Sequence, residues 1–226
     1  RDRVQFNEDT LWTGQPQDYQ HPGAAAFLPQ VRQLLFEGKQ REAEALAAQN
    51  MMSVPLRQED YQPFGDLWLS CAHREARNYR RELDLDTAIA RVTYQLAGAA
   101  YTREVFSSAP DQVLVVRLTC DQPGRIAFTA RLNRAERAST QSPAPGELAL
   151  SGQLDNGQGG PGMKFIARLK VINEGGQVTA SGDGLRVEGA DSATLLLTAA
   201  TDYLPRPPDY RGKPYESLSA RQLEDA

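Results

Sequence analysis

The chain has 226 residues, 40% of them hydrophobic and 24% charged, which is the composition of an ordinary globular protein long enough to bury a substantial core. Its formal net charge of −4 and its scattered arginines argue against a nucleic-acid partner, because binding to phosphates relies on clustered Lys and Arg. No apolar run approaches the roughly 20 residues that cross a bilayer, so we expect no membrane partner.

The first third of the chain predicts a helical hairpin. Residues 1–23 are irregular and rich in Gln, Asp, Pro and Gly. Leu28, Val31 and Leu35 then follow with helical spacing, and Gly38 ends that segment. Residues 39–52 (KQREAEALAAQNMM) are mostly strong helix formers. Together these patterns predict a helical hairpin over about residues 24–52.

After residue 60 the hydrophobic period changes to two, which indicates strands. Leu67 and Leu69 alternate with Trp68, residues 79–96 continue this alternation, and residues 112–119 are apolar on both faces, as expected of a central strand. Further strands follow, with turns at Gly, Pro, Asn and Asp, for roughly ten in all. The predicted fold class is mainly β: a large β-sandwich (supersandwich) of antiparallel strands with the helical hairpin inserted near its N-terminus.

The last segment differs in kind. Residues 204–217 (LPRPPDYRGKPYES) are rich in proline and charge, and residues 216–226 begin a helical pattern. This composition is typical of a linker before another domain. We therefore expect a β-sandwich domain over residues 1–202 and the start of a linker over residues 203–226.

Residue types that carry catalysis or bind metals form no recognisable pattern. His21 and His73 have no nucleophile at a suitable spacing, and Cys71 and Cys120 fit neither a zinc nor a redox motif, so free thiols are expected. Adjacent carboxylates, such as Glu8 with Asp9, are not distinguished from the background of 29 acids. We predict no catalytic residue, no metal site and no cofactor in this chain.

Aromatic residues could form a platform for stacking sugars. Those on strands usually fill the core, so Trp68 and Phe128 are expected to be buried. Residues in loop-like stretches are the better surface candidates, namely Trp12, Tyr19, Tyr61 and Tyr210.

Several blocks of sequence resemble the α-L-fucosidases of glycoside hydrolase family 95. They are FNEDTLWTGQP at residues 6–16, VRQLLFEGKQREAEALA at 31–47, YQPFGDLWL at 61–69, YRRELDLDTAIARVTY at 79–94, YTREVFSSAPDQVLVVRL at 101–118 and GADSATLLLTAATDY at 189–203. Any one block would be a weak signal, but their order and their coverage of nearly the whole chain make the resemblance specific.

The resemblance implies an N-terminal β-sandwich that precedes a helical linker and an (α/α)6 barrel. In such enzymes the barrel carries the general-acid glutamate and the asparagine and aspartate that activate water in an inverting mechanism, and none of these has a counterpart in this chain. We therefore expect the chain alone to be inactive and its main partner to be the barrel. The resemblance also implies a secreted or periplasmic location.

Two stretches outside the strand periodicity are expected to face the barrel, and a glycan is a further candidate ligand there. The candidate substrate or interface residues are Asn7, Glu8, Trp12, Tyr61 and Gln62. The alternative interpretation is a stand-alone carbohydrate-binding module. Saturable quenching of Trp12 fluorescence by fucosylated oligosaccharides would favour that alternative.

Overall fold

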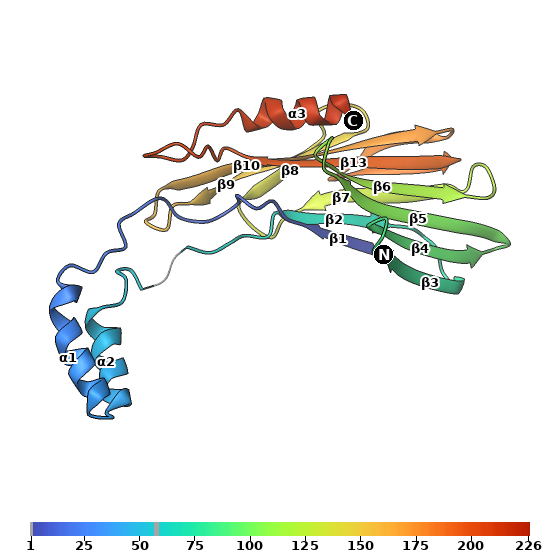
Figure 1. Ribbon diagram of the computed structural model, residues 1–226. Coiled ribbons are helices and arrows are strands. Elements are labelled where there is room, and N and C mark those ends of the chain that lie inside the picture. The colour runs from blue at the N-terminus through green and yellow to red at the C-terminus, as the bar shows by residue number, and fades with distance from the viewer. Residues whose placement is uncertain (1, 57–58) are drawn as a thin grey trace.

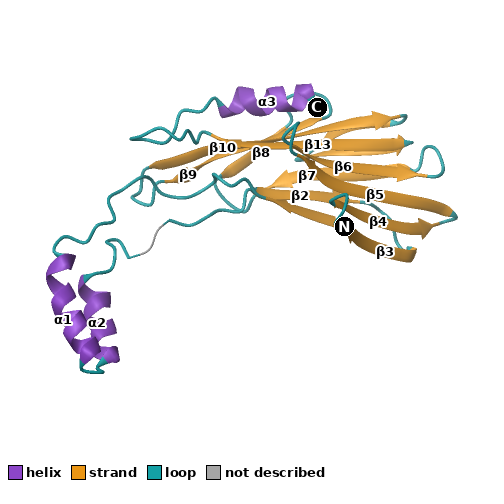
Figure 2. Cartoon of the chain, viewed as in Figure 1, coloured by secondary structure: helices purple, strands orange, loops and turns teal. Residues whose placement is uncertain are grey.

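The structure is a computed structural model that describes residues 2–56 and 59–226. In Figure 1, two antiparallel β-sheets lie face to face, a helical hairpin projects from one end, and a C-terminal helix lies along the larger sheet. Figure 2 shows that helix is confined to these two places, so the rest of the described chain is strand and loop. The predicted mainly β sandwich with a helical hairpin near its N-terminus is confirmed.

The smaller sheet contains five strands. Its spatial order is β1 (Asp2–Phe6), β2 (Gly65–Ser70), β7 (Ile126–Asn133), β12 (Gly184–Ala190) and β11 (Gln177–Ser181).

The larger sheet contains eight strands. Its spatial order is β3 (Arg77–Asp84), β4 (Ile89–Leu96), β5 (Ala99–Ser108), β6 (Val113–Cys120), β13 (Ser192–Thr201), β10 (Pro161–Glu174), β9 (Glu147–Asp155) and β8 (Ala138–Gln141).

Alternating side chains from both sheets build the core. Leu67 and Leu69 of β2 are fully buried, and Phe128 of β7 is also in the core, as the sequence predicts. In β13 both faces are covered, because Leu195 faces the core between the sheets while Leu196 packs beneath the C-terminal helix. Most of residues 193–200 are therefore buried, because the smaller sheet covers one face of β13 and the C-terminal helix packs on the other.

Two expectations about strands need correction. Residues 79–96 form a hairpin of two strands, β3 and β4, with a turn at residues 85–88. The carboxylate of Asp84 causes this break by accepting hydrogen bonds from the amides of Asp86 and Thr87 at 2.9 and 3.3 Å, which is a typical Asx turn.

Trp68 was expected in the core but is only half-buried. Because Leu67 and Leu69 occupy the inner positions of β2, Trp68 points outward, where the Arg3 guanidinium lies 5.6 Å from its ring.

The two cysteines are free, as predicted, although both are half-buried. Desolvation raises the pKa of the Cys71 thiol. This thiol is therefore mostly protonated at neutral pH, and its environment is not that of an activated nucleophile.

The helical hairpin consists of a 3-10 turn (η1, Ala24–Phe27) and two short helices, α1 (Leu28–Phe36) and α2 (Gln40–Asn50). It matches the predicted range of about 24–52. None of the helices among the described residues has the length and apolar character needed to cross a membrane.

The C-terminal helix α3 (Tyr215–Asp225) packs on β10 and β13. Leu223 is buried there against Val113, Val115 and Leu196, and the Thr198 hydroxyl donates a hydrogen bond to the Ser219 carbonyl at 3.3 Å. The helical pattern at the end of the sequence is therefore realised as a helix attached to the outer face of the sandwich.

Candidate functional site

A cleft of about 520 Å³ lies at the end of the sandwich from which the helical hairpin projects. It is lined by residues 9–10 and 12–16, by Tyr19 and Glu59, by Met163 of β10, and by residues 203 and 209–211. Three of the four aromatic residues expected at the surface line this cleft, namely Trp12, Tyr19 and Tyr210. The lining residues run from Asp9 to Arg211, so segments from opposite ends of the chain meet here.

Trp12 lines the cleft, and Tyr61 lies directly beside it, so that the two form an aromatic pair at the rim. Their backbones form an antiparallel bridge, and their ring centroids are 5.3 Å apart. The Trp12 indole N–H donates to the Asp9 carbonyl at 3.0 Å, and the Tyr61 hydroxyl donates to the Glu8 carbonyl at 3.2 Å. Both side chains nevertheless remain about 40% exposed (42% and 40%). The pair thus presents aromatic surface to solvent with little freedom left to lose on binding.

Glu8 shapes the loop behind this pair. Its carboxylate accepts hydrogen bonds from the backbone amide and the hydroxyl of Thr10, at 2.9 and 2.6 Å, and Thr10 in turn contacts the Thr201 hydroxyl at the end of β13. Burial raises the pKa of Glu8, and the two hydrogen bonds from Thr10 partly oppose that shift. Glu8 therefore connects the loop to the larger sheet.

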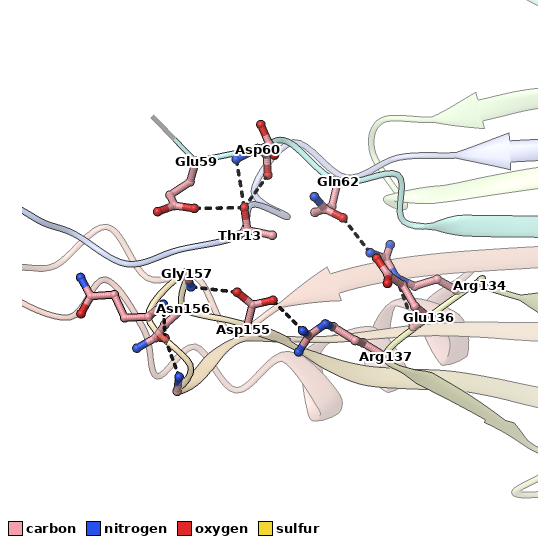
Figure 3. A network of polar contacts seen from close by, with 12 residues as sticks. Thr13, Glu59, Asp60, Gln62, Arg134, Glu136, Arg137, Asp155, Asn156 and Gly157 are labelled. Atoms are coloured by element: carbon pink, nitrogen blue, oxygen red, sulfur yellow. Dashed lines mark hydrogen bonds and ion pairs between the residues drawn. The ribbon is translucent and has the colours of Figure 1, made fainter. Parts of the chain in front are cut away.

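Gly14 and Glu59 are packed so closely that only glycine fits. Gly14 has a φ of +88°, and a Cβ atom added there would lie 2.0 Å from Glu59 Cγ. The Thr13 hydroxyl accepts a hydrogen bond from the Asp60 amide at 2.9 Å and lies 3.4 Å from the Glu59 carboxylate, as Figure 3 shows. On the facing hairpin, the Asp155 carbonyl accepts a hydrogen bond from the Gly14 amide at 3.2 Å. The cleft wall is therefore held at both of its edges.

Arg211 closes the opposite side of the cleft. Its guanidinium donates to the carbonyls of Pro161 and Gly162, both at 3.0 Å, and to the Gly14 carbonyl at 3.3 Å. Because Tyr203 and Arg211 also form a backbone bridge, the segment between them is a loop fixed to the sandwich. Tyr210 was predicted at the surface from the sequence, but Arg211 was not, because its three carbonyl partners carry no sequence signal.

Of the five predicted site residues, Trp12 lines the cleft, whereas Asn7, Glu8, Tyr61 and Gln62 are not among its lining residues. Asn7 is exposed directly after β1. The backbone amide of Gln62 donates to the Leu11 carbonyl at 3.0 Å. Its side-chain oxygen accepts a hydrogen bond from Arg134, also at 3.0 Å, as Figure 3 shows. The structure brings Glu8, Trp12 and Tyr61 together, whereas Gln62 contacts Leu11 and Arg134 instead.

The histidines have ordinary structural contacts. His73 Nδ1 lies 2.7 Å from the Tyr94 hydroxyl, and its ring packs against Tyr101. His21 Nδ1 lies 2.9 Å from the Met52 carbonyl. Within residues 2–56 and 59–226, no group of three or more His, Cys, Asp or Glu side chains could hold a metal ion.

The fold and the cleft together describe a β-sandwich domain with a fixed aromatic rim at one end. The family model for the glycosyl hydrolase family 65 N-terminal domain matches residues 1–206, and this chain belongs to that family.

Two curated relatives cover most of the chain. "Alpha-L-fucosidase 2" of Arabidopsis thaliana is 33% identical over 224 residues, which is 88% of this chain and 26% of that protein. "Probable alpha-fucosidase A" of Aspergillus niger is 27% identical over 217 residues, again 88% of this chain and 26% of the relative. The predicted resemblance to the N-terminal part of α-L-fucosidases is confirmed, and the chain spans about a quarter of the length of these relatives.

Among solved structures, a protein from the human microbiome named as a kojibiose phosphorylase aligns with 70% of this chain and 24% of its own chain. The sequence identity is 10% and the TM-score is 0.42.

Proposed function

We propose that this chain is the non-catalytic N-terminal domain of an inverting α-L-fucosidase-type glycoside hydrolase. In this proposal the sandwich supports an (α/α)6 catalytic barrel, and its cleft forms one wall of the substrate site. The similarity to two proteins named as fucosidases supports the class, and the length of those relatives leaves ample chain for a barrel.

The observation that carries the proposal is the Trp12–Tyr61 pair at the rim of the cleft. An aromatic ring offers an apolar face on which the C–H face of a sugar can stack, and such rings are most effective when they are already held in place. Here two hydrogen bonds and a backbone bridge hold the pair while leaving it exposed. Carboxylates in the lining, such as Asp209, could accept hydrogen bonds from sugar hydroxyls.

The proposal assigns binding and support to this chain, and bond cleavage to the barrel. General-acid and water-activating groups must flank the scissile bond from opposite sides, and such a pair is expected on the barrel side of the site. Residues 203–226 are proposed to be the start of the linker to that barrel. Because they pack on the sandwich through Arg211 and helix α3, they would fix the position at which the chain leaves the sandwich and enters the barrel.

Removing the Trp12 ring tests this proposal in the full-length polypeptide. Trp12→Ala is expected to lower kcat/KM for a fucosylated oligosaccharide about 10-fold, which corresponds to about 1.4 kcal/mol of lost transition-state stabilisation. Initial rates measured over a range of substrate concentrations provide this number.

The matched control is Tyr79→Ala. Tyr79 on β3 is also an exposed aromatic residue, 54% accessible, but it does not line the cleft. This variant is expected to keep kcat/KM within about two-fold of the unsubstituted enzyme, because it removes no contact with substrate. If both variants retain the same activity, the cleft is not a wall of the substrate site.

A further inference from the structure

The helical arm, defined as η1, α1 and α2 (residues 24–50), stands away from the sandwich at its cleft end (Figures 1 and 2). The main contacts of its three elements are with one another, and no strand is among their main neighbours. The arm therefore gains little support from the domain to which it is attached.

The arm is too small to be stable by itself in water. Helix α1 has nine residues and α2 has eleven, and neither has a side-chain N-cap. Isolated helices shorter than about 12–15 residues are marginal even with favourable sequences, and most helical stability in proteins comes from packing. Only Ala43 is buried in these two helices, so the packing between them supplies little of that stability.

Apolar side chains point outward along α1. Leu28 and Phe36 are eight residues apart on one helix face with Arg32 between them, and they line a shallow hollow of about 470 Å³ that Glu37 also borders. Phe36 is 85% exposed. Exposed apolar and aromatic side chains beside an arginine are typical of protein–protein interfaces, where aromatic residues and Arg are enriched.

The two segments that carry the arm also form the rim of the cleft. Pro16 and Tyr19 lie on the incoming segment and Glu59 on the outgoing one, and all three line the cleft. The Val54 amide donates to the Tyr19 carbonyl at 3.2 Å, which holds the two segments together. A domain that covers the cleft would therefore lie close enough to contact the arm.

We propose that the outward face of α1 docks onto the catalytic portion of the same polypeptide, so that the arm clasps that portion beside the cleft. The identity of this partner rests on the proposed function, and the relatives, of which this chain spans 26%, have the necessary length. A covalently attached partner is also favoured over a second copy, because linkage gives it an effective concentration on the order of millimolar.

Hydrogen exchange measured by mass spectrometry tests the docking. In the full-length polypeptide the amides of α1 and α2 are expected to exchange about 100-fold more slowly than in the 226-residue chain, because docking suppresses local opening. The amides of α3 serve as an internal reference, since that helix already packs on the sandwich. Equal exchange of the arm in the two proteins would overturn the proposal. Exchange that slows with rising concentration of the 226-residue chain would also overturn it, in favour of a second copy.

A matched pair of variants identifies the face involved. Phe36→Asp is expected to accelerate exchange of the arm at least about 10-fold in the full-length polypeptide, while Leu85→Asp leaves it unchanged. Leu85 is 84% exposed in the β3–β4 turn, so the two substitutions add the same charge at equally exposed apolar sites. Equal effects of the two variants would refute docking through α1. This readout does not depend on activity. If Trp12→Ala leaves kcat/KM unchanged, the cleft is not a wall of the substrate site, but amide exchange still tests whether α1 docks.

Discussion

Replacing Phe64 with alanine is expected to lower the free energy of unfolding of the chain by about 3–5 kcal/mol, the largest loss we expect from a single substitution here. Phe64 is fully buried, and its ring lies 5.6 Å from that of Phe6 on β1 and 5.4 Å from that of Phe165 on β10. It therefore joins the two sheets directly beneath the Tyr61–Gln62 segment. Alanine would leave a cavity between sheets that are each held by their own hydrogen bonds, so the site cannot collapse fully.

Urea unfolding followed by circular dichroism measures this loss. Phe36→Ala is the control, because it removes the same ring from a site that is 85% exposed, and its effect should stay within about 0.5 kcal/mol. If Phe64→Ala costs no more than Phe36→Ala, the aromatic contact between the sheets does not stabilise the fold.

Replacing Arg134 with methionine is expected to cost about 2–3 kcal/mol. The guanidinium donates to the Gln62 side chain at 3.0 Å, to the Phe64 carbonyl at 3.3 Å and to the Pro63 carbonyl, and it stacks 5.2 Å from the Phe165 ring. The guanidinium also donates to the Glu136 carbonyl at 3.1 Å, so methionine keeps the apolar stem over that ring but leaves four acceptors without their charged donor. Burial lowers the pKa of Arg134, which agrees with a cation that is partly removed from water.

The loss of the Arg134 hydrogen bonds should also increase the rate of amide exchange nearby. The amides of Gln62 and Phe64, which donate to the Leu11 and Phe6 carbonyls, are expected to exchange faster with solvent in the variant. Arg80→Met is the control, because Arg80 is an exposed arginine whose ion pair with Glu82 should contribute less than about 1 kcal/mol. Slow exchange of both amides in Arg134→Met would contradict the role given to this side chain.

Much of the fold could be predicted because periodicity reports burial directly. The alternation of Leu67 and Leu69 predicted the inner face of β2, and the apolar residues 112–119 predicted a central strand, which is β6 between β5 and β13. The helical hairpin followed from spacing and helix propensity alone. The break at Asp84 was missed because it depends on a side chain capping backbone amides, and hydrophobic periodicity does not record that contact.

The cleft could be predicted only in part. Trp12, Tyr19 and Tyr210 were recognisable as aromatic residues outside strand periodicity, and all three line it. Their meeting depends on long-range contacts, such as those of Arg211 with the carbonyls of Gly14 and Pro161, which no local pattern encodes. Gly14 offered the nearest sequence signal, because glycine is the usual residue where the backbone takes a positive φ or another group approaches it closely.

Fucose release by purified proteins tests the central claim most directly. The full-length polypeptide and this chain would be incubated at equal molar concentration with a fucosylated oligosaccharide, and free fucose would be measured over time. We expect turnover by the full-length polypeptide and only the buffer rate with this chain. Fucose release that rises in proportion to the concentration of the 226-residue chain, with traces of longer protein excluded, would contradict the assignment of catalysis to the barrel.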